Sequence, residues 1–154
     1  MDFADELRRL GHEVRTFEYR KDNPLYKNRG TKAAYQSYIL RSLERTCVRW
    51  RPSLVLVVKG TPITAELIDR VKRKCDIVFI NFFPDNPLWM MPLAAIEAYD
   101  VFFTKERYAM RSLQQVGIRN LAYLPMYCVP SEHYPRDADA GGGAPLRRAH
   151  LVRR

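Results

Sequence analysis

Cysteine and glycine are both scarce in this sequence of 154 residues, which has three cysteines and seven glycines. Cys47, Cys75 and Cys128 lie far apart and form no CxxC pair, so neither a disulfide framework nor a zinc site is indicated. The glycines form no GxGxxG, P-loop or GxSxG signature, and HExxH is missing as well. We therefore expect no metal site and no tightly held cofactor.

Long apolar runs are also missing. None approaches the roughly 18 residues that a transmembrane helix needs. The first six residues carry a net negative charge and lack the profile of a signal peptide, so a cytoplasmic location is the default expectation. Hydrophobic content of 47% and charged content of 28% are ordinary for a globular protein, and the length suits one domain with a core.

Acidic residues are fewer than basic ones, at 17 against 26, which gives a formal net charge of +9. Such an excess is compatible with nucleic acid or an acidic membrane surface as partner. The charge is spread along the chain, and the densest stripe, Arg41, Arg45 and Arg49, follows one helix face and is typical of a solvated surface. Peripheral contact with an acidic membrane surface or a phosphorylated ligand is the alternative, whereas no specific nucleic acid partner is expected.

The most informative stretch is Leu54–Val58 followed by Lys59-Gly60-Thr61-Pro62. Five consecutive apolar residues predict a strand buried on both faces, as in a parallel sheet. Gly60 permits a backbone conformation that other residues avoid, and Thr61 before Pro62 predicts a helix start. Since open α/β sheets bind ligands beyond the carboxyl ends of their strands, Lys59, Gly60 and Thr61 are candidate site residues.

Helices and strands alternate along the rest of the chain. The apolar periodicity predicts helices at 2–10, 31–50, 64–74, 92–98 and 105–116, and strands at 12–19, 53–58, 76–81, 99–103 and 118–124. Each of the two strands that end near Asn81 and Phe103 leads into a polar turn, the first containing Asp85 and the second Thr104 and Lys105. Thr104 is expected to cap the last helix.

This alternation predicts an α/β fold with a Rossmann-like, doubly wound parallel sheet. The chain begins on a helix, whereas such a sheet normally begins on a central strand and a glycine-rich turn. We therefore expect the sheet to lack its first central strand. Residues 1–135 are predicted to form the domain, and residues 136–154, rich in Arg, Ala and Gly, a disordered basic tail.

Several stretches resemble glycosyltransferases of the GT-B fold. Leu7–Val14 is similar to their "LxxxGHEV" stretch, and Arg51–Gly60 resembles the "RPDLVLVxKG" strand of proteins related to the spore-maturation CgeB group. Asn81–Pro87 resembles that group's "NWxPDDP" loop, and Tyr123–His133 its "LPxxxDPxxH" exit. The similarity covers about residues 3–135. Two departures are Asn86 and Val129, which stand where Asp is usual.

The resemblance implies the amino-terminal, acceptor-side domain or a fragment of such an enzyme, without the carboxyl-terminal domain that holds most of the nucleotide-sugar site. The implied partners are a nucleotide sugar and a glycan, protein or lipid acceptor, and the implied domain is inactive alone. Neither donor sugar, acceptor nor stereochemistry follows from the sequence.

Glycosyl transfer without a metal needs a base for the acceptor hydroxyl and donors for the leaving diphosphate. Asp85 is the candidate base, and its alternative role is to form an Asx turn. Lys59, Asn81, Thr104 and Lys105 are candidate substrate contacts, with strand-end solvation and helix capping as the alternatives. A separate reading is a standalone Rossmann-like module that binds a nucleotide or sugar phosphate.

Overall fold

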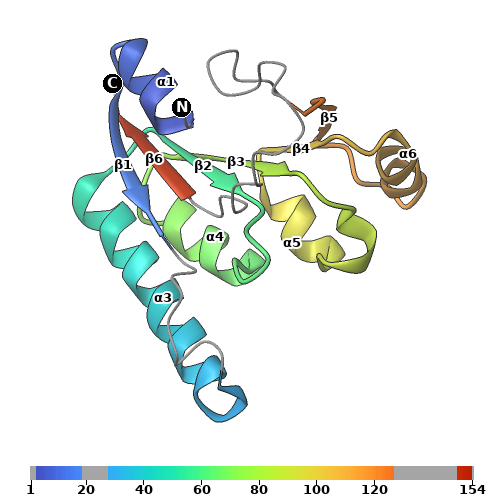
Figure 1. The fold of residues 1–154 in the computed structure, drawn as a ribbon. Helices are drawn as coiled ribbons and strands as arrows, with labels where there is room; N and C mark the ends of the chain where they lie inside the picture. The colour runs from blue at the N-terminus through green and yellow to red at the C-terminus, as the bar shows by residue number, and fades with distance from the viewer. Residues whose placement is uncertain (1–2, 19–27, 127–148, 154) are drawn as a thin grey trace, which may run out of the picture.

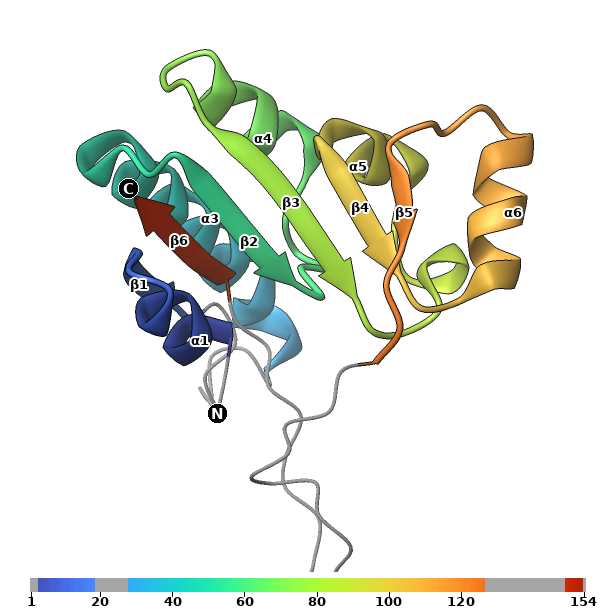
Figure 2. The same cartoon turned by 90° about the horizontal axis from the view of Figure 1, so that it is seen from above.

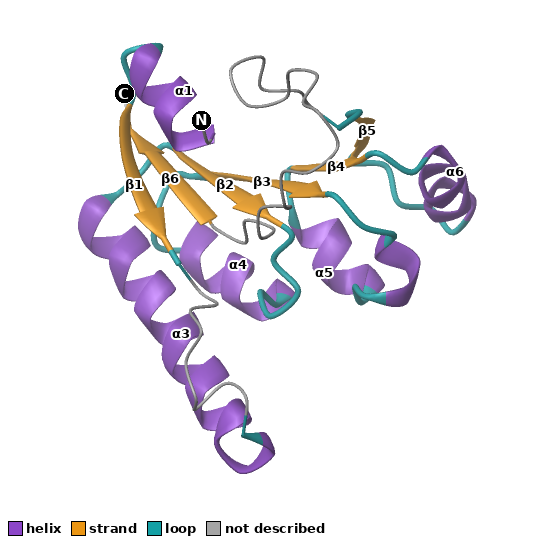
Figure 3. Ribbon diagram, in the orientation of Figure 1, coloured by secondary structure: helices purple, strands orange, loops and turns teal. Residues whose placement is uncertain are grey.

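The computed structural model describes residues 3–18, 28–126 and 149–153. Helices and strands alternate along this part of the chain (Figures 1 and 3). The elements in chain order are α1 (Phe3–Arg9), β1 (Glu13–Phe17), α3 (Arg29–Trp50), β2 (Leu54–Val58), α4 (Ala65–Lys72), β3 (Val78–Phe83), the 3-10 helix η1 (Pro87–Trp89), α5 (Leu93–Ala98), β4 (Val101–Thr104), α6 (Arg107–Gln115), β5 (Leu121–Tyr123) and β6 (Ala149–Arg153).

The described strands form one sheet with the order β1-β6-β2-β3-β4-β5. Strands β2 to β5 are parallel, and their register sets Val58 opposite Phe82 and Phe83 opposite Thr104. Strand β6 is antiparallel to both of its neighbours, so β1 runs in the same direction as β2. All strands except β6 therefore end at the same edge of the sheet.

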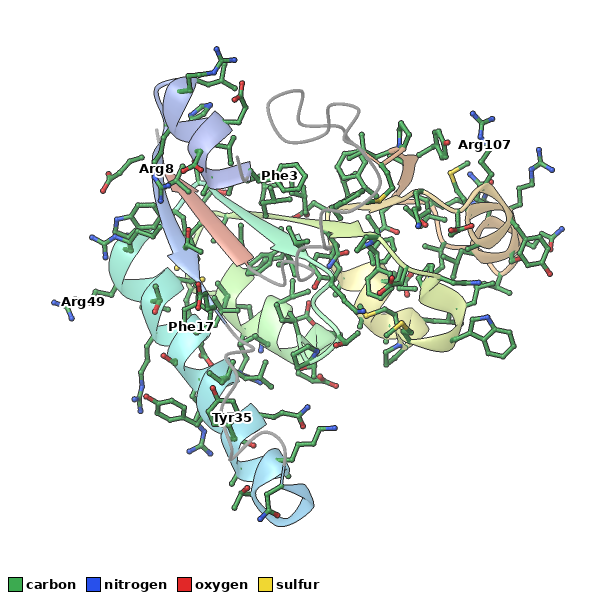
Figure 4. The ribbon with its side chains drawn as sticks, viewed as in Figure 1. Phe3, Arg8, Phe17, Tyr35, Arg49 and Arg107 are labelled. Carbon is green, nitrogen blue, oxygen red and sulfur yellow. The ribbon has the colours of Figure 1, made fainter. Side chains whose placement is uncertain are left out.

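Helices lie on both faces of this sheet. Helices α3, α4 and α5 cover one face, α1 lies on the opposite face near β1 and β6, and α6 lies beside β5 at the far edge (Figures 1 and 2). Helix α1 is joined to β3 by an edge-to-face contact of Phe3 with Phe82, whose ring centroids are 5.9 Å apart. Phe3 points from α1 toward the sheet in Figure 4.

The hydrophobic core lies between the sheet and the layer of α3, α4 and α5. It takes alternate residues from each strand, because successive side chains of a strand point to opposite faces. Val55 and Val57 from β2 and Phe79 and Phe83 from β3 are fully buried there. The helices contribute the apolar positions of their inward faces, including Leu43, Cys47, Leu67, Ile68, Val71, Ala95 and Ile96.

The predicted fold class is confirmed. The chain is an α/β protein in which four parallel strands are flanked by helices, as in a Rossmann-like fold that lacks a strand. The place between β1 and β2 is occupied by β6. The prediction of a disordered tail from Arg136 onward is therefore wrong for residues 149–153, because their main chain pairs with two strand edges. Residues 136–148 and the predicted boundary at residue 135 lie outside the described residues.

Two predicted element boundaries need correction at the edge where the strands end. Strand β3 continues to Phe83 instead of ending at Asn81, because Phe82 and Phe83 are both buried and extend the pairing with β2 and β4. Asn81 therefore lies inside the strand, and Asp85 follows its end. The last helix begins at Arg107, with Glu106 as its N-cap, and not directly after Thr104.

The predicted helix at 64–74 corresponds to α4, but the prediction that Thr61 caps its start is wrong. Thr61 and Pro62 lie inside a turn that the Ile63 N–H closes by donating to the Gly60 carbonyl oxygen at 2.9 Å. The N-cap is Thr64, whose hydroxyl oxygen accepts from the Leu67 N–H at 3.3 Å. This shift buries Ile63, which with Ile68 occupies the two positions of a hydrophobic staple.

Candidate functional site at the carboxyl edge of the sheet

The turn after β2 has an unusual backbone conformation. Lys59 and Gly60 are both left-handed, with φ of 70° and 71°. For a lysine this conformation costs roughly 1–2 kcal/mol, so the surrounding structure must hold it in place. The Lys59 N–H donates to the Phe82 carbonyl oxygen at 2.8 Å, which ties the turn to the neighbouring strand. The turn directs the Lys59 side chain toward the loop that follows β3.

The Lys59 ammonium group meets the Asp85 carboxylate in this loop. Its Nζ donates to Asp85 Oδ2 and forms an ion pair with it. The Lys59 side chain is only 10% exposed, whereas Asp85 is 45% exposed. Among the described residues, Asp85 Oδ1 makes no hydrogen bond. One carboxylate oxygen is therefore anchored by a nearly buried cation, while the other is available to a ligand in solvent.

Asn81 supports the turn from beneath. It is fully buried on β3, and its Nδ2 donates to the Lys59 carbonyl oxygen at 3.2 Å. Its Oδ1 is buried and has no hydrogen-bond partner among the described residues. Asn81 has no exposed surface, and its observed hydrogen bond helps to fix the position of Lys59. Its predicted contact with substrate stays a prediction.

Gly60 is required by packing as well as by backbone conformation. A Cβ atom at this position would lie 2.4 Å from Val57 Cγ1 and 3.1 Å from Asn81 Nδ2. Both distances are shorter than ordinary van der Waals contacts, so a larger residue would displace the turn from Asn81. Thr61, the next predicted contact, is half-buried inside the turn.

Thr104 and Lys105 follow the next strand along the sheet. Thr104 is fully buried, and its hydroxyl oxygen accepts from the Glu106 N–H at 3.1 Å. Lys105 is partly exposed and lies 3.9 Å from the Glu106 carboxylate. Within the described chain no hydrogen bond or ion pair joins Thr104 or Lys105 to Lys59 or Asp85. The structure thus brings four predicted residues into one contact group, Lys59, Gly60, Asn81 and Asp85, and leaves these two beside it.

Trp89 is an exposed aromatic residue in the segment that follows β3. Phe82 and Phe83 are buried in β3, but Trp89 at the end of η1 is 86% exposed. The 3-10 helix turns Pro87 inward, and Asn86 fixes its start by accepting from the Leu88 N–H at 3.0 Å. A helix of three residues cannot bury all of its side chains. The sequence signal for the start of η1 is Asn86 followed by Pro87. An aromatic face four residues from Asp85 can stack on a sugar ring.

The arginine stripe of α3 lies away from this edge. Arg41, Arg45 and Arg49 are exposed and line an open hollow of about 580 Å³ together with Lys74. Arg49 extends away from the molecule in Figure 4. The one carboxylate in this hollow, Glu44, bonds Lys74 Nζ at 2.6 Å and Arg70 Nε at 3.2 Å. The hydrogen bond from Lys74, and then that from Arg70, hold the pKa of Glu44 below its usual 4.5.

The described cysteines behave as buried apolar residues. Burial raises the pKa of the Cys47 thiol to about 12, with a smaller contribution from neighbouring Cys75. Cys47 is therefore protonated at neutral pH, which makes it a poor nucleophile. Cys128 lies outside the described residues.

Within residues 3–18, 28–126 and 149–153, no three His, Cys, Asp or Glu side chains come together as metal ligands would. No helix in those ranges has the length and apolar character needed to cross a membrane. No protein-family model matches the sequence, and no curated protein matches it either.

Proposed function

We propose that this chain is the acceptor-side domain of a GT-B glycosyltransferase, working in the cytoplasm on a nucleotide sugar bound mainly by a second domain. The observation that carries the proposal is the Lys59–Asp85 pair at the carboxyl edge of the sheet. This edge is where open α/β sheets bind their ligands. The resemblance of the surrounding motifs to the CgeB group supplies the reaction class.

In this proposal Asp85 accepts the proton of the acceptor hydroxyl while that oxygen attacks the anomeric carbon and the sugar–diphosphate bond breaks. A general base must reach the proton it removes, and Asp85 Oδ1 is the carboxylate oxygen left available for this. Lys59 orients the carboxylate through Oδ2, and Asn81 and Gly60 hold Lys59 in its left-handed conformation. Trp89 offers an apolar face against which the acceptor sugar can stack.

The first test is binding by the isolated chain. Adding oligosaccharides to the 15N-labelled protein is expected to shift the amide signals of Gly60, Asp85 and Trp89 saturably. Asp85→Asn should weaken this binding roughly tenfold, the effect of losing one charge-assisted hydrogen bond of about 1.5 kcal/mol. Asp76→Asn is the matched control, because Asp76 is exposed before β3, at the opposite edge of the sheet. Equal effects of the two substitutions would contradict the proposed site.

A standalone binding module for a nucleotide or sugar phosphate is the alternative function. It predicts that UDP or glucose 1-phosphate alone saturates the same amides and that oligosaccharides do not. The acceptor-side proposal predicts the reverse, and no sugar transfer by this chain without a donor domain.

A further inference from the structure

Strand β6 occupies a position that the rest of the sheet leaves open. Strands β1 and β2 are parallel, yet neither pairs with the other, because β6 lies between them (Figure 2). Each of its residues from Ala149 to Arg153 is in register with a residue of β1, and four of them are also in register with β2. At about 4.8 Å per strand spacing, an empty position would separate β1 and β2 by about 10 Å.

The walls of this position are held by contacts that do not involve β6. Strand β1 is attached to α3 by the Arg15 guanidinium, which lies 5.0 Å from the centre of the Trp50 ring. Helix α1 is attached to β3 through Phe3 and Phe82. Strand β2 is paired with β3 along its whole length. Contacts outside β6 therefore help to place both strand edges, in addition to their pairing with β6.

One side chain of β6 is anchored in the core. Leu151 is fully buried and belongs to the same cluster as Cys47, Trp50 and Val55. Its register partners are Arg15 on β1 and Val55 on β2, so it faces the layer of α3. Main-chain pairing at a strand edge and burial of an alternate apolar side chain are the elements by which sheets bind extended peptides.

We propose that the position between β1 and β2 is a binding site for an extended peptide, and that a peptide with the sequence of residues 147–154 occupies it in trans. In the isolated chain β6 fills the site in cis. The specificity of the site comes from the burial of Leu151 in the core cluster. This inference goes beyond the proposed transferase function and does not depend on it.

The test uses the full chain carrying Leu151→Gln and two synthetic peptides of residues 147–154, one with Leu151 and one with Gln at that position. The substitution places a polar group in the core and should lower Tm by on the order of 5 °C. Excess Leu peptide is expected to restore most of this loss by occupying the vacated site, whereas the Gln peptide is not. The peptides carry equal charge, so nonspecific attraction to the protein is matched.

An unchanged Tm of the Leu151→Gln chain, or equal stabilisation by both peptides, would overturn the proposal. If the variant does not fold, fluorescence anisotropy of the labelled peptides with the wild-type chain provides the second measurement. The Leu peptide should then bind at least tenfold more tightly than the Gln peptide, and equal affinities would overturn the proposal. The Asp85→Asn chain should bind the Leu peptide like the wild type, which separates this site from the transferase site.

Discussion

Gly60 is constrained both by its backbone conformation and by the side chains packed around it. Its left-handed φ of 71° favours glycine, and its missing Cβ leaves room for Val57 and Asn81. Gly117 has a similar φ of 96°, but a Cβ there would meet nothing within 4 Å. Comparing substitutions at these two glycines therefore separates the cost of backbone strain from the cost of a steric clash.

Gly60→Ala should destabilise the protein more than Gly117→Ala. The control substitution is expected to cost about 1 kcal/mol, from backbone strain alone. At Gly60 the contact with Val57 should add about 1–3 kcal/mol, because a packed core accommodates an extra carbon poorly. Urea unfolding monitored by circular dichroism measures both values. Similar losses at the two positions would mean that the turn after β2 is not closely packed.

At the scale of elements, Glu44 joins helices α3 and α4. Its carboxylate on α3 forms ion pairs with Arg70 of α4 and with Lys74 in the turn that follows α4. The exposed arginines of α3 make no such link among the described residues, so their positive charge is available to an anionic partner. Contact with an acidic membrane surface stays a prediction for this stripe.

Glu44→Gln should alter how stability depends on pH. A carboxyl group whose pKa is lowered by folding stabilises the protein above its unfolded pKa of 4.5, and this contribution is lost as pH falls through the folded value. The variant should be less stable at pH 7 by on the order of 1 kcal/mol and should converge with the wild type in acid. Glu97→Gln, at an exposed position without an ion pair in the described chain, is the control. A pH-independent difference between Glu44→Gln and the wild type would contradict this account.

For the whole molecule, stability depends on an incomplete parallel sheet. Most strand residues of the large core cluster lie on β2, β3 and β4, whereas β1 is joined to the sheet by strand pairing only through β6. A sheet that lacks its own central strand buries less apolar area, so we expect the isolated chain to be marginally stable, near the lower end of the usual 5–15 kcal/mol.

Hydrogen exchange should reveal two levels of protection. Amides of β2 and β3 are expected to exchange only by global unfolding, while those of β1 and β6 exchange together through a smaller opening that releases β6. Native-state exchange at increasing urea concentrations measures both free energies. Equal protection of β1 and β3 would show instead that the sheet opens as one unit.

Much of this architecture was predictable from local sequence. The apolar run of Leu54–Val58 identified a buried parallel strand, and alternation with amphipathic stretches identified the α/β class. Predicted boundaries failed where two local signals competed. Thr61 before Pro62 resembles a helix start as closely as Thr64 does, and only the burial of Ile63 decides between them.

The sequence by itself determined the order of helices and strands and the glycine in the turn after β2, because both depend on residues close together in the chain. Only the tertiary structure decided that Lys59 pairs with Asp85 and that residues 149–153 enter the sheet beside β2. These contacts join segments that are distant in sequence, and apolar periodicity carries no information about which strand edges meet. The pairing of buried main-chain groups settles that choice, since each edge must find hydrogen-bond partners.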